Sequence, residues 1–113
     1  MTRKEQYVKF MRMCRMLEEY AELMNIPLRH ATAHRTIEEC QRLVKEGTGI
    51  LNSKHRWSLA HDYWIITSSG KDIEWKCTGY AILGRFWKFL GGRWGGDWKK
   101  KDIFHFELAE RPA

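Results

Sequence analysis

Four side chains in this sequence are of the types that bind zinc and activate water: His55, Asp62, Asp102 and His105. Each lies at the edge of a segment whose residue pattern predicts a strand, so each can be held in a fixed position. Two neutral imidazoles and one carboxylate give three nitrogen and oxygen ligands that suit zinc, and they leave a fourth position for water. The remaining acidic residue, Asp102 or Glu107, would then be the base that takes a proton from that water.

The strand pattern also indicates which way one ligand points. Residues 59–67 are rich in β-branched and aromatic side chains, which predicts a strand. Successive side chains of a strand point to opposite faces, so Asp62 shares a face with Trp64 and Ile66. His61 points to the other face and is therefore not expected to be a ligand.

Helices are expected before and after this strand. Apolar residues recur every three or four positions between residues 3 and 24, and again between residues 78 and 90, which predicts two amphipathic helices. The face expected to be buried in the first helix includes Tyr7, Met11 and Met24. A third helix is predicted to begin at Thr36, because a threonine followed three residues later by glutamate forms a capping box.

Two further strands and one loop complete the pattern. A strand is predicted at 28–34, after Pro27 ends the first helix, and a second at 103–108, where apolar and polar residues alternate. The glycine-rich stretch 91–98 is expected to be a loop. The expected fold is therefore α+β: one small domain over residues 1–113, in which an antiparallel sheet packs against helices.

Composition sets limits on the partners. The chain has 113 residues, 43% of them hydrophobic, which is enough apolar material for a core and argues against disorder. The net charge of +6 favours anionic partners. The exposed-looking run Lys99 to Lys101 could steer an acidic peptide toward Asp102 and His105. A nucleic-acid-binding domain remains an alternative on charge alone, but no groove-reading motif supports it.

The cysteines and the N-terminus carry expectations about compartment. Cys14, Cys40 and Cys77 are too widely spaced for a ligand pair or a disulfide framework, so reduced thiols are expected, with the latter two in the core. The basic N-terminus is followed by no apolar segment, and no run of about 18 apolar residues occurs. We therefore expect a protein made in the cytoplasm without a signal peptide or a membrane span.

Three short motifs carry a family resemblance. Residues 53–62 read Ser-Lys-His-Arg-Trp-Ser-Leu-Ala-His-Asp and resemble the S-x-H-x-x-G-x-A-x-D signature of the zinc DD-carboxypeptidase and L-alanyl-D-glutamate endopeptidase family. That family includes the vancomycin-resistance peptidases VanX and VanY and many phage endolysins. Residues 102–107 resemble its second signature, in which an acidic residue stands three positions before the last ligand histidine. Residues 34–36 are similar to the Y-R-[ST] stretch that precedes both, so the resemblance spans 35–107.

The resemblance assigns a role to each matching residue. It implies that His55, Asp62 and His105 bind Zn²⁺, that Asp102 is the general base and acid, and that Arg35 stabilises the oxyanion. It also implies a fold like that of the DD-peptidases and the Hedgehog signalling domain. Glu107 would then anchor a ligand or the substrate rather than act as the base.

Two departures and one variation bear on this assignment. Ser58 stands where the family usually has glycine, and a positive φ there would strain the loop. His34 stands where an aromatic residue is usual. Aspartate rather than glutamate at position 102 is similar to the phage endopeptidase branch.

The resemblance predicts a zinc metallopeptidase that hydrolyses an amide bond in the peptidoglycan stem peptide, with L-alanyl-D-glutamate as the expected bond. The protein would act as a phage endolysin. A D-alanyl-D-alanine carboxypeptidase is the alternative within the same class, and a non-catalytic zinc-binding relative is the alternative outside it. The expected partner is peptidoglycan, with no nucleic acid and no stable membrane insertion. The expected protein is a monomer that waits in the host cytoplasm until it is released onto the cell wall.

Overall fold

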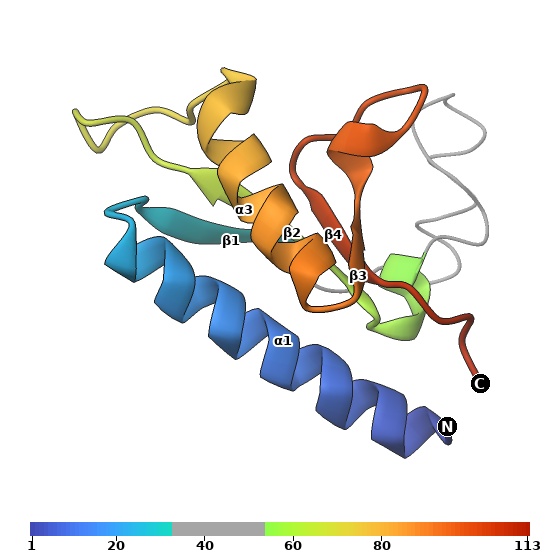
Figure 1. Ribbon diagram of the computed structural model, residues 1–113. Coiled ribbons are helices and arrows are strands. Elements are labelled where there is room, and N and C mark those ends of the chain that lie inside the picture. Colours follow the sequence, from blue (N-terminus) through green and yellow to red (C-terminus); the bar gives the residue numbers. More distant parts are fainter. Residues whose placement is uncertain (33–53) are drawn as a thin grey trace.

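The computed structural model describes residues 1–32 and 54–113, with His55 and Arg56 described by their backbone alone. Within these ranges the chain forms two α-helices and a four-stranded sheet (Figure 1). The elements are α1 (Arg3–Leu23), β1 (Leu28–Thr32), the short 3₁₀ helix η1 (Lys54–Trp57), β2 (Ala60–Ile65), α3 (Cys77–Phe89), β3 (Gly92–Trp94), the 3₁₀ helix η2 (Gly95–Asp97) and β4 (His105–Leu108). The helix predicted to begin at Thr36 lies outside the described residues.

Helix α1 begins at a capping box, although the sequence prediction did not use it. The Thr2 side chain accepts a hydrogen bond from the Glu5 amide at 3.1 Å, and the Glu5 carboxylate accepts one from the Thr2 amide at 3.1 Å. Together these bonds satisfy two amides that the first turn would otherwise leave without partners. The helix ends before Asn25, whose φ of 57° lies in the left-handed region.

The predicted buried face of α1 was partly wrong. The buried positions are Gln6, Phe10, Met13, Cys14, Leu17 and Ala21. Tyr7, Met11 and Met24 are 39%, 54% and 46% exposed. The apolar stripe is therefore turned slightly about the helix axis relative to the prediction, because Gln6 and Met13 take places on the covered face.

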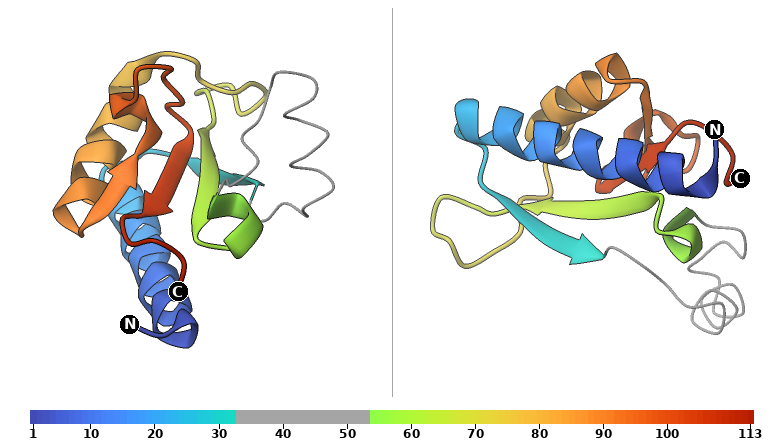
Figure 2. Two further views of the ribbon diagram at one scale, coloured as in Figure 1. Left: turned by 90° about the vertical axis from the view of Figure 1, so that its right-hand side faces the viewer. Right: turned by 90° about the horizontal axis from the view of Figure 1, so that it is seen from below.

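The sheet is antiparallel with strand order β1-β2-β4-β3. Helices α1 and α3 both lie on one side of it (Figure 1; Figure 2, left). Large side chains that are fully buried in the core come from both helices and from the inner face of the sheet, among them Leu17, Tyr63, Tyr80, Leu83, Trp87 and Phe106. The α+β prediction is confirmed, and the opposite face of the sheet is the one on which Asp62 and His105 lie.

The glycine-rich stretch is more regular than predicted. It forms β3 and η2 rather than a simple loop. A Cβ atom at Gly92 would lie 2.1 Å from the indole Nε1 of Trp87, and one at Gly84 would lie 2.3 Å from the Trp94 ring. Glycine is required at both positions because the backbone packs directly against a tryptophan ring and leaves no room for a side chain.

The two cysteines that the structure describes differ in their burial. Cys14 is buried, but Cys77, predicted to be a core thiol, is exposed as the first residue of α3. A residue in the first turn of a helix is covered only when another element packs over that end. Cys40 lies outside the described residues. No helix in the described ranges is long and apolar enough to cross a membrane.

Candidate active site

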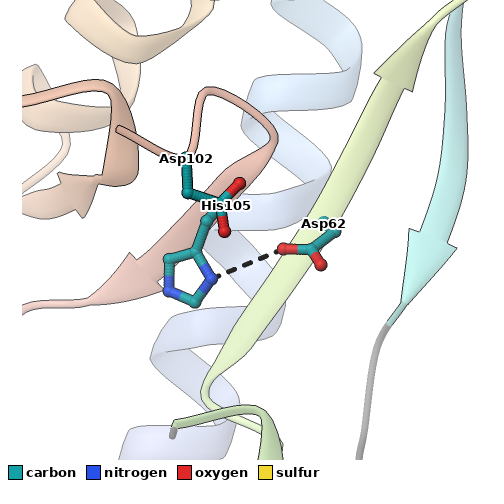
Figure 3. A group of neighbouring side chains, drawn as sticks. All are labelled: Asp62, Asp102 and His105. Carbon is teal, nitrogen blue, oxygen red and sulfur yellow. Dashed lines mark ion pairs between the residues drawn. The ribbon is translucent and has the colours of Figure 1, made fainter. Parts of the chain in front are cut away.

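Asp62, Asp102 and His105 meet on the sheet face opposite the helices (Figure 3). One ligand atom from each lies within 4.8 Å of the others. Asp62 and His105 are register partners on β2 and β4, so their side chains emerge side by side on one face. Asp102 enters from the segment between η2 and β4. The strand alternation predicted for Asp62 is confirmed, since its neighbours His61 and Tyr63 are buried on the helix side.

The two nitrogens of the His105 ring have different partners. Nδ1 faces Asp62, with Oδ1 at 3.4 Å (Figure 3). Nε2 lies 2.8 Å from Oε1 of Glu107. The second oxygen of Glu107 accepts a hydrogen bond from Nζ of Lys54 at 2.7 Å, and the same ammonium donates to the Leu108 carbonyl at 2.8 Å. This chain of contacts fixes the ring and leaves Nδ1 directed at Asp62.

The carboxylates control the protonation of this buried ring. Burial lowers the pKa of His105, but hydrogen bonds and charge from Asp62 and Glu107 outweigh it and raise the pKa to about 9. Burial raises the pKa of Glu107, while His105 and Lys54 outweigh that effect and hold it below its ordinary value. In the metal-free protein the ring therefore carries a proton at neutral pH. A metal ion at Nδ1 would have to displace that proton.

Backbone contacts place Asp102 beside the histidine. Its amide donates to the Gly95 carbonyl at 3.0 Å, and its carbonyl accepts from the His105 amide at 3.2 Å. A Cβ atom at Gly95 would lie 2.3 Å from the Asp102 carbonyl oxygen and 3.1 Å from the Cβ of His105. The Trp98 ring packs on the His105 ring with centroids 4.8 Å apart. Gly95 is therefore the residue that lets this segment approach β4.

The donor set fits a zinc ion. Zinc ligands lie at about 2.0–2.2 Å, so the donor atoms of a tetrahedral site are about 3.4 Å apart. Oδ1 of Asp62 and Nδ1 of His105 are 3.4 Å apart, which is the spacing that two ligands of one zinc ion require. Carboxylate oxygen and imidazole nitrogen are ligands that zinc accepts, and Glu107 supplies the outer contact that ligand histidines usually make.

The structure brings together three of the residues that sequence reasoning selected. They are Asp62, Asp102 and His105. The other two candidates are the ligand His55 and the oxyanion-stabilising Arg35. The side chain of His55 and the whole of Arg35 lie outside the described residues. Their roles stay predictions.

Two expectations about neighbouring residues are supported by the geometry. Glu107 contacts the ligand candidate His105 rather than the open side of the site, as expected for an anchoring residue. His61 lies away from the site, with its Nε2 atom 2.7 Å from Nδ1 of His30.

Sequence reasoning missed three contributors to the site: Lys54, Gly95 and Trp98. Lys54 had one available signal, because it stands next to His55 in the first motif. Gly95 was assigned to a loop on composition, and nothing in the sequence places Trp98 over His105.

Two aspartates and a histidine on the open face of a small α+β sheet form an arrangement suited to metal-assisted hydrolysis. The chain belongs to the M15 peptidase family, since a family model described as D-alanyl-D-alanine carboxypeptidase matches residues 46–108, more than half of its length. This confirms the family expected from the motifs and makes the protein a peptidase.

A solved structure agrees with this assignment. The chain is similar to the crystal structure of the Serratia marcescens L-Ala D-Glu endopeptidase ChiX, with a TM-score of 0.72 and 26% sequence identity. The match covers 88% of this chain and 77% of that one. The shared architecture therefore extends well beyond the matched family segment.

Proposed function

We propose that this protein is a zinc-dependent peptidase that cuts the L-alanyl-D-glutamate bond of the peptidoglycan stem peptide. The observation that carries the proposal is the convergence of Asp62, Asp102 and His105, with Nδ1 of the histidine facing Asp62. The family supports a peptidase, and the similar Serratia protein is an L-Ala D-Glu endopeptidase.

In this proposal His55, Asp62 and His105 hold the metal. Zinc, when bound, would polarise the scissile carbonyl and lower the pKa of a water molecule from about 15.7 to about 7. Asp102 accepts the proton of the attacking water and passes it to the leaving amine. Its proximity to Asp62 and His105 supports this role. Arg35 stabilises the developing oxyanion through its guanidinium. Glu107 holds the His105 ring in place.

The biological setting proposed is that of a phage endolysin. A chain with net charge +6 is attracted to an acidic wall, and charge attraction raises local concentration near the substrate. We propose that the monomer waits in the host cytoplasm and reaches the wall after a separate protein opens the membrane.

The alternative function is that of a D-alanyl-D-alanine carboxypeptidase, which is the description of the matching family model. The two activities would share the metal and Asp102 and differ in the groups that hold the substrate. Digestion of purified peptidoglycan in the presence of zinc separates them by the product. New amino termini on D-glutamate are expected, whereas release of free D-alanine would establish the alternative.

The same digestion tests the proposal as a whole. An Asp102→Asn variant serves as the control, because it keeps the size of the side chain and removes its basicity. We expect product from the wild type and none above background from the variant. Absence of any new amino group with the wild-type protein and zinc would refute a wall-peptidase function.

A further inference from the structure

The sheet face that carries the candidate active site continues along β2 to an aromatic and basic surface. The β1–β2 pair has a register shift between His30 and Thr32, which adds a residue to β1 and leaves the alternation of β2 intact. Asp62 and Trp64 are two residues apart on β2, so they share this face, and Trp64 is half-buried. Two residues along a strand span about 7 Å. Trp64 therefore lies beside the site, on the side toward the end of β2.

Arg29 of β1 lies across the strand pair from Trp64. The two residues are register partners, and the guanidinium carbon of Arg29 lies 5.6 Å from the centre of the Trp64 ring. The ring contact holds the planar guanidinium over this face while the side chain stays exposed. Arg29 thus presents a fixed positive charge about two residue positions from Asp62.

The same arginine lines a cavity. The cavity has a volume of about 490 Å³ and is formed between β1 and the turn that follows β2. Lys71 and Trp75 also line it, together with Asp72, whose carboxylate offsets one of the two positive charges. The remaining net charge of the cavity wall is positive, and its apolar surface comes from Ile66, Ile73 and the exposed Trp75.

We infer that Arg29, supported by Trp64 and Lys71, forms a subsite for a carboxylate of the peptide substrate. This inference rests on the proposed function and deepens it by naming the substrate group that is recognised. Arg29 is a diagonal neighbour of Asp62 on the adjacent strand, and such neighbours lie about 7–8 Å apart. An extended peptide rises by about 3.3 Å per residue, so Arg29 can reach a carboxylate about two residues from the cut bond. In an L-alanyl-D-glutamate stem, the glutamate next to that bond carries a free carboxylate.

The experiment compares two synthetic stem peptides that differ in one group. The first keeps the free carboxylate of D-glutamate, and the second carries a carboxamide there. Hydrolysis of both is measured for the wild type and for Arg29→Gln, with Arg29→Lys as the conservative variant. Arg85→Gln is the matched control, since Arg85 is an exposed arginine on α3, which covers the opposite face of the sheet.

A charge-assisted hydrogen bond changes the free energy by an amount that corresponds to about tenfold or more in affinity. We expect the wild type to prefer the carboxylate peptide by at least about tenfold in kcat/KM, mainly through KM. Arg29→Gln should reduce the ratio to near one, Arg29→Lys should restore part of it, and Arg85→Gln should leave it unchanged. A ratio that Arg29→Gln does not alter would overturn the subsite.

A binding measurement distinguishes failure of the carboxylate subsite from failure of the peptidase function. The dissociation constants of the same two peptides, made with an N-methylated scissile amide that resists hydrolysis, are measured with the wild type and Arg29→Gln. A preference that depends on Arg29, without hydrolysis of the unmodified peptides, would refute the peptidase function and support the subsite. Hydrolysis of the unmodified peptides together with equal affinity for both N-methylated peptides, or with no binding of either, would refute the subsite and support the peptidase function.

Discussion

Oε1 of Glu107 lies 2.8 Å from Nε2 of the His105 ring, and this contact leaves Nδ1 of the ring directed at Asp62. The two residues are adjacent positions on the same face of β4, so the contact is set by the strand itself. A histidine held in this way offers one nitrogen to a metal and cannot turn to offer the other.

Glu107→Ala is expected to weaken zinc binding by about 10- to 100-fold, since the ring loses the contact that orients it. Competition with a chromophoric chelator measures the affinity. Glu110→Ala is the control, because the Glu110 carboxylate pairs with Lys9 near the end of the chain rather than with His105. Equal affinity in the wild type and Glu107→Ala would show that Glu107 does not position the ligand.

Lys54→Met tests the ion pair between Lys54 and Glu107. The Lys54 and Glu107 side chains are only 14% and 9% exposed, so loss of the ammonium leaves a nearly buried carboxylate with one partner fewer. We expect the free energy of unfolding to fall by about 3 kcal/mol in urea titrations. Lys88→Met removes an ion pair with Asp97 that is 41% and 49% exposed, and it should cost less than about 1 kcal/mol. Similar losses in both variants would contradict this account of Lys54.

Gly95→Ala tests whether Asp102 is positioned by the close approach of η2 to β4. The new methyl group would lie 2.3 Å from the Asp102 carbonyl oxygen, so the segment must move. We expect kcat/KM to fall at least about tenfold, because a displacement of about 1 Å at a catalytic group has effects of that order or larger. Gly79→Ala is the control, since its methyl group meets only the flexible end of Ile65 at 2.8 Å. Full activity in Gly95→Ala would rule out this positioning role.

Much of this arrangement could be predicted from local pattern. Strand alternation placed Asp62 opposite to His61, and the spacing of the last motif placed His105 and Glu107 on one face of a strand. The first motif drew attention to the position next to Lys54 but could not assign a role to Lys54, because its contact with Glu107 joins residues 53 positions apart in the sequence. Gly95 was read as loop because glycine composition does not distinguish a free turn from a backbone packed against its neighbours.

Ser58 stands where the family usually has glycine, and its backbone conformation is one that glycine favours. Ser58 has a φ of 57°, the left-handed region in which glycine is favoured. Ser58→Gly should therefore raise the free energy of unfolding by about 0.5–1 kcal/mol, after allowance for the greater flexibility of glycine in the unfolded chain. Ser58→Ala keeps the Cβ atom and should give no gain. An equal gain in both variants, measured by urea titration, would mean that backbone strain is not the cause.

Asp62, Asp102 and His105 lie together on one face of the sheet, and we propose that they form a metal-dependent catalytic centre in which Asp102 acts on protons rather than on the metal. The most direct test is zinc stoichiometry measured together with peptide hydrolysis in the wild type, Asp102→Asn and Asp62→Asn. We predict one zinc per chain in the wild type and in Asp102→Asn, greatly reduced zinc in Asp62→Asn, and hydrolysis by the wild type alone. Full zinc occupancy with undiminished hydrolysis in Asp62→Asn, or hydrolysis by Asp102→Asn at the wild-type rate, would contradict the account.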